Sequence, residues 1–107
     1  MLFRSRNVPN LTRDYADQIG LYFEPGSANQ VVSVKLPGHM VSWQGFARGA
    51  YSTLRPGGVI DMNLYLTGPA AEQAAIRAAA VEALSRAGFR NVTVTGENVG
   101  TILKAAR

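Results

Sequence analysis

The chain has 107 residues, 47% of them hydrophobic and 17% charged, which predicts a single domain, residues 1–107, with enough apolar side chains for its own core. Its net charge of +4 suits an anionic partner, and its low charged fraction leaves a surface suited to contact with other proteins. The absence of cysteine excludes disulfides, thiolate metal sites and cysteine nucleophiles, and the single histidine, His39, excludes any one-chain site that needs two imidazoles.

The first quarter of the chain is predicted to hold one short helix. Residues 1–9 contain no apolar run typical of a signal sequence, and we expect an N-terminal arm. Over residues 10–20, apolar side chains recur at helical spacing after Pro9, which predicts a helix. Residues 20–25 are too short to classify by periodicity, and they can form a brief edge strand before a turn.

Alternating apolar residues predict strands between residues 31 and 66. Residues 31–36 alternate cleanly, and after a turn at Pro37 and Gly38 the chain can return over residues 39–46 as a hairpin partner. Residues 50–54 lie between glycine-rich stretches and can form a further strand. The alternation is most regular over residues 59–66, where one face is entirely apolar. That face consists of Ile60, Met62, Leu64 and Leu66.

A long helix is predicted over residues 69–87, because Pro69 is tolerated in a first turn and Gly88 ends the pattern. Residues 91–95 then return as a strand, and the C-terminal tail, residues 97–107, can form a last short helix. We therefore expect an α+β fold: a two-layer sandwich, with a mainly antiparallel sheet of four to five strands and one long helix packed across it.

The outward face of the long helix lacks the lysines and glutamates typical of a solvated helix. Small side chains let another backbone approach closely, so we interpret this face as an interface with a second copy or another protein. Because alanine is also a good helix former on exposed surfaces, simple exposure is the alternative interpretation. The candidate interface residues are Ala71, Ala74, Ala78, Val81 and Ser85.

Arginines and aromatic residues are interleaved in the middle of the chain, a composition typical of surfaces that stack on bases and bind phosphates. No ribonucleoprotein consensus accompanies them, and the aromatic residues can equally belong to the core. The candidate nucleic-acid-binding residues are Trp43, Arg48, Tyr51, Arg55 and Tyr65.

Residues able to perform catalysis do not form a recognisable constellation. His39 and Asp61 could face each other across strands, with Ser42 or Ser52 as a nucleophile, but nothing in the sequence fixes that geometry. The acidic residues show no metal-ligand spacing. We therefore predict no enzyme, no catalytic or metal-binding residues and no cofactor, and a nuclease that works without histidine is the activity hardest to exclude.

These features together favour a non-catalytic, self-associating assembly or adaptor protein that acts through protein–protein contacts, such as a phage virion or accessory component. The alternative is a small basic nucleic-acid-binding protein that uses its arginines and aromatic residues. We expect a homo-oligomer or a protein partner. No apolar stretch is long enough to span a membrane, so we expect a cytoplasmic protein or one assembled into a virion.

Overall fold

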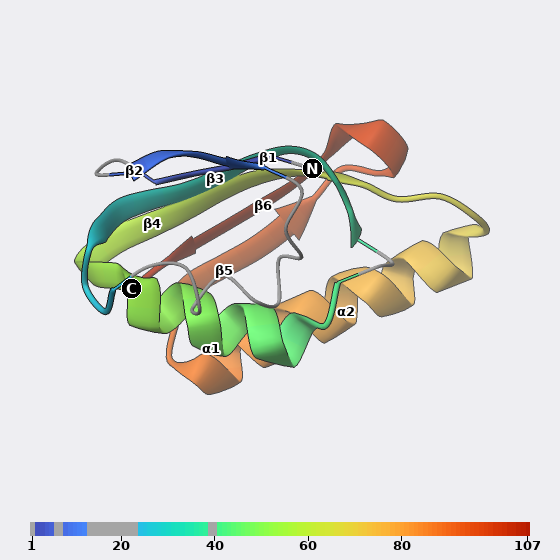
Figure 1. Ribbon diagram of the computed structural model, residues 1–107. Coiled ribbons are helices and arrows are strands. Elements are labelled where there is room, and N and C mark those ends of the chain that lie inside the picture. Colours follow the sequence, from blue (N-terminus) through green and yellow to red (C-terminus); the bar gives the residue numbers. More distant parts are fainter. Residues whose placement is uncertain (1, 6–7, 13–23, 39–40) are drawn as a thin grey trace.

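In the computed structural model, a layer of two helices lies against one face of a single mixed sheet (Figure 1). The structure describes residues 2–5, 8–12, 24–38 and 41–107. The strand order is β2-β1-β3-β4-β6-β5. The elements in chain order are β1 (Leu2–Ser5), β2 (Val8–Thr12), β3 (Ala28–Pro37), α1 (Trp43–Thr53), β4 (Leu54–Tyr65), α2 (Ala70–Ala87), β5 (Arg90–Thr95), a 3-10 turn (Asn98–Gly100) and β6 (Thr101–Ala106).

The core lies between the helices and the sheet. On β4 the side chains alternate between this core and the opposite face of the sheet, which confirms the apolar face predicted over residues 59–66. On α2, Ala80, Ala83 and Leu84 are buried, and Ile76 and Ala87 pack against the same core. The expected α+β class is therefore confirmed, and the buried side of α2 packs against the core.

The segment before β4 forms a helix, so the predicted hairpin over residues 39–46 and the strand over residues 50–54 are wrong. The buried residues Trp43, Phe46, Ala47 and Ala50 recur at helical spacing, whereas the alternation around residue 43 is too short to identify a strand. Because α1 connects β3 to β4, these neighbouring strands run parallel. The sheet is consequently mixed rather than mainly antiparallel, and two helices cover it rather than one.

Two predictions for the N-terminal region also need correction. Residues 2–5, expected to be part of an arm, form β1, which pairs with β3 through Phe3 opposite Ser33. The helix expected over residues 10–20 begins inside β2, and the rest of that segment lies outside the described residues, together with most of the edge strand expected over residues 20–25. Backbone pairing with distant strands decides these conformations, which local periodicity does not report.

The C-terminal tail, expected as a short helix over residues 97–107, is a strand in its larger part. β6 pairs antiparallel with β4 on one side and with β5 on the other. Its side chains alternate, with Thr101, Leu103 and Ala105 buried against the helices. Hydrogen bonds to two neighbouring strands therefore outweigh the helical spacing of the few apolar residues in the tail.

A buried amide fixes the start of α2 to the turn before β6. The side chain of Gln73 is 5% exposed, and its Nε2 donates hydrogen bonds to the Gly68 carbonyl at 2.9 Å and to Asn98 Oδ1 at 2.8 Å. Its Oε1 accepts a hydrogen bond from the Asn98 backbone N–H at 3.1 Å. Both amide hydrogens and the carbonyl oxygen are thus used, as a buried polar group requires.

Candidate functional site

The candidate site is a groove between α1 and α2, which lie side by side on the same face of the sheet (Figure 1). It consists of two adjoining cavities of about 270 and 280 Å³ that share Gln44, Ala83 and Arg86. We call their combined lining the helix groove. Its residues are Ser42, Trp43, Gln44, Arg48, Ala79, Glu82, Ala83, Arg86 and Ala87.

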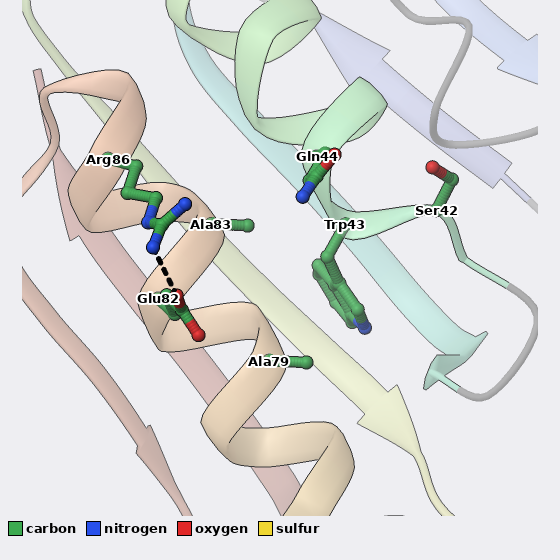
Figure 2. Close-up of a pocket in the computed structure, with 7 residues that line it drawn as sticks. All are labelled: Ser42, Trp43, Gln44, Ala79, Glu82, Ala83 and Arg86. Carbon is green, nitrogen blue, oxygen red and sulfur yellow. Dashed lines mark ion pairs between the residues drawn. The ribbon is translucent and has the colours of Figure 1, made fainter.

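Small side chains on α2 leave this groove open. Ala79, Ala83 and Ala87 are spaced four residues apart, so they form one row along the side of α2 that faces α1. Figure 2 shows Ala79 and Ala83 pointing from α2 toward α1. Gln44 and Arg48 form a matching row on α1, again four residues apart. Methyl groups are too short to fill the space between the two rows.

Trp43 closes one end of the groove from α1 (Figure 2). It is 7% exposed and packs edge-to-face against Phe46, with ring centroids 5.8 Å apart. Its main role is therefore to anchor the start of α1 in the core, and only a small part of it contributes to the groove.

The groove carries an excess of positive charge. Arg86 pairs with Glu82 at 2.9 Å, but both side chains are largely exposed, at 75% and 63%, and such a pair contributes little free energy. Arg48 is exposed and makes no ion pair with another described residue. Two guanidinium groups therefore face one carboxylate, which favours an anionic occupant.

The predicted interface residues lie elsewhere on α2. Four of the five are exposed and Val81 is half-buried, so the face predicted to point outward does so. None of them lines the helix groove. The alanine face, as we name this surface, consists of Ala71, Ala74, Ala78, Val81 and Ser85.

The predicted nucleic-acid-binding residues do not form one surface. Trp43 belongs to the core, and Arg48 lines the helix groove. Tyr51 is half-buried. Arg55 lies at the start of β4, whereas Tyr65 lies at its other end, where it is 37% exposed. The rings of Trp43, Tyr51 and Tyr65 are therefore not arranged together as one stacking platform.

Three arginines stand at the ends of neighbouring strands, where β4 and β5 begin and β6 ends. Arg107 donates a hydrogen bond to the Leu54 carbonyl, and its guanidinium lies 4.3 Å from the centroid of the Tyr51 ring. Arg90 donates to the Arg107 carbonyl at 3.3 Å. Arg55 follows Leu54 directly, so we call Arg55, Arg90 and Arg107 the basic end.

On the described strands β4, β5 and β6, the sheet face away from the helices carries both polar and apolar side chains. Val59 is 39% exposed there, and Asp61, Thr93 and Lys104 line a shallow cavity of about 380 Å³ beside it. Asp61 and Lys104 are paired in register, but no ion pair joins them. Over the described residues of β4, β5 and β6, polar side chains such as Asp61, Thr93 and Lys104 therefore separate the apolar ones on this face.

The three suggested catalytic residues that the structure describes, Ser42, Ser52 and Asp61, are not brought together. Ser42 and Ser52 are exposed at the two ends of α1, and Asp61 lies on the opposite face of the sheet. His39 lies outside the described residues. In the part of the chain that the structure describes, no group of His, Asp or Glu residues could hold a metal ion, and no helix is long and apolar enough to cross a membrane.

Sequence reasoning did not single out Gln44, Ala79, Ala83 or Arg86 as site residues. The signal that could have found them is the four-residue spacing on each helix, which is visible only once residues 43–53 are assigned to a helix. Because the sequence pattern predicts strands for this segment, it does not place Gln44 and Arg48 on one helix face.

Comparisons with known proteins inform only the fold. No protein-family model and no curated protein sequence matches the chain. A possible exported protein from Bordetella parapertussis is similar over 89% of this chain and 43% of its own, with a TM-score of 0.62 and 16% identity. The apo form of the S-adenosylmethionine-dependent methyltransferase SibL is similar over 83% of this chain and 33% of its own, with a TM-score of 0.53 and 21% identity. This chain thus spans less than half of either structure.

Proposed function

We propose that the chain is a non-catalytic assembly or adaptor protein that associates with further copies of itself through the alanine face of α2, in the cytoplasm or in an assembled virion. The observation that carries this proposal is that the face is exposed yet contains no charged side chain. An exposed helix usually presents charged residues to water, whereas a helix that meets another helix presents small or apolar ones.

Packing geometry supports contact between two such faces. Ala71, Ala74 and Ala78 project only a methyl group, so the axes of two helices can approach to about 8 Å, the lower end of the usual range. Two copies with a net charge of +4 each repel one another at long range. Contact through an uncharged face adds no close repulsion between like charges, and a symmetric dimer places the same residues on both sides.

The test is the mass of the double variant Ala74→Glu and Ala78→Glu, measured by light scattering. Four carboxylates then meet at a symmetric interface, and we expect the variant to become monomeric while its circular dichroism stays unchanged. The control variant Thr93→Glu and Thr95→Glu adds the same charge to exposed positions on β5 and should keep the wild-type mass. An Ala74→Glu and Ala78→Glu variant with the wild-type mass contradicts the proposal.

Nucleic-acid binding is the second candidate function, and the gathering of three arginines at the basic end favours it. Affinity for an oligonucleotide should fall steeply as salt rises, because phosphate contacts release counterions. Arg55→Ala should lower the slope of log affinity against log salt by about 1. Binding with an unchanged slope would remove the basic end as the contact surface.

A further inference from the structure

We propose that the helix groove is a docking site for an extended acidic segment of a partner protein. This inference rests on the proposed function in protein–protein contact, but it concerns a different side of α2. The alanine face and the helix groove share no residue, so one helix can serve a second copy on one side and an acidic segment on the other.

The arginine side chains of the helix groove favour an acidic occupant. Arg48 and Gln44 are exposed and make no hydrogen bond or ion pair with other described residues. The ion pair of Arg86 with Glu82 is exposed, so Arg86 can exchange this carboxylate for one from a partner at little cost. Guanidinium groups bind carboxylates through two parallel hydrogen bonds, which gives both strength and orientation.

The length and depth of the helix groove favour an extended segment over a helix. The row from Ala79 to Ala87 spans eight helical steps, or about 12 Å. An extended chain rises about 3.3 Å per residue, so three or four residues fit along this row. Two shallow cavities below 300 Å³ each do not accommodate a helix, whose diameter with side chains is about 10 Å. The groove therefore suits an extended segment with alternate acidic side chains.

The probe is a fluorescent eight-residue peptide of alternating glutamate and glycine, titrated with the full chain and followed by fluorescence anisotropy. A peptide with lysine in place of glutamate, and a single-stranded oligothymidylate, are titrated in parallel. We expect the glutamate peptide to bind and the lysine peptide not to bind. An oligothymidylate that binds more tightly than the glutamate peptide and displaces it from the chain would overturn the proposal in favour of a nucleic acid.

Two charge-reversal variants, one inside the groove and one outside it, distinguish docking in the groove from attraction of the peptide to the net positive charge of the protein. Arg48→Glu should weaken binding of the glutamate peptide about tenfold, because a contact is lost and a repulsion is added. Lys104→Glu changes the net charge equally but lies on the sheet face away from the groove, and it should change affinity by less than about twofold. Equal weakening by both variants would contradict docking in the groove.

Filling the groove tests its shape without changing charge. Ala79→Leu should weaken peptide binding about fivefold, because the leucine side chain occupies the space between the helices. Ala75→Leu is the matched control, since Ala75 is exposed one turn earlier on α2 and lines neither cavity. If Ala79→Leu and Ala75→Leu bind the peptide as the wild type does, the peptide does not occupy the groove.

The two proposals can fail separately. Peptide binding that follows the predicted pattern, in a chain whose mass is unaffected by Ala74→Glu and Ala78→Glu, would contradict self-association and support the groove. A mass that falls in that double variant, in a chain that binds no glutamate peptide, would contradict the groove alone.

Discussion

The polar groups beside the two ends of α2 differ in their hydrogen bonding: Gln73 of α2 itself lies near the start, and Gln44 and Arg48 of α1 lie beside the later part. Near its start, every hydrogen-bonding atom of the Gln73 side chain is paired with Gly68 or Asn98. Near its end, Gln44 and Arg48 face the helix groove without a partner among the described residues. The buried, paired end stabilises the fold, and the exposed, unpaired end is available to another molecule. Variants at the first end should therefore change stability, and variants at the second should change binding.

The largest effect on stability is expected for Gln73→Leu. This change leaves the Gly68 carbonyl and the polar groups of Asn98 without their partners in a half-buried place, at a cost of about 2–3 kcal/mol. For a domain of this size the melting temperature should fall by about 10–15 °C in a circular dichroism scan. An unchanged melting temperature would contradict this account, because it would show that water satisfies the partners of the Gln73 amide with no loss of stability.

Two buried threonines sharpen the comparison, because only one of their hydroxyl groups is paired. Thr101 Oγ1 donates to the Asn98 carbonyl at 3.0 Å, whereas Thr53 Oγ1 is buried with no hydrogen-bond partner. Thr101→Val should destabilise the protein by about 1 kcal/mol, and Thr53→Val should stabilise it by a similar amount. Urea denaturation measures both, and changes of the same sign would contradict this account.

The smallest effect on stability is expected at the groove. Arg86→Ala removes an exposed ion pair with Glu82, and the free energy of unfolding should change by less than about 0.5 kcal/mol. The same variant should weaken binding of the glutamate peptide several-fold, as an equilibrium titration would show. A large loss of stability would show that the pair supports the fold, and the contrast between the ends of α2 would then be wrong.

The spacing of apolar residues is sufficient to predict the segments in which that spacing continues over several repeats. The apolar face of β4 and the helix α2 are predicted because each pattern extends over several repeats of its own period. The outward position of Ala71, Ala74 and Ala78 followed from the same helical repeat. The burial of side chains therefore agrees with the sequence pattern where the periodicity of a single helix or strand determines which side chains face the core.

Segments that depend on distant partners were not predictable in this way. β6 is a strand because Leu103 pairs in register with Met62, about forty residues earlier, as well as with Val94 of β5. Helix α1 contains Gly45 and Gly49, each of which disfavours a helix by about 1 kcal/mol, and packing of Phe46 against the core offsets that cost. Since the helix groove needs α1, its residues could not be assembled from the sequence.

The most direct test of self-association is the mass of the wild-type chain, measured by light scattering on a sizing column at low and high salt with the absorbance ratio at 260 and 280 nm. We predict a defined oligomer, a multiple of 11.5 kDa, that is free of nucleic acid at both salt concentrations. A monomer that carries nucleic acid at low salt and loses it at high salt would contradict the account and would favour the basic end as the functional surface.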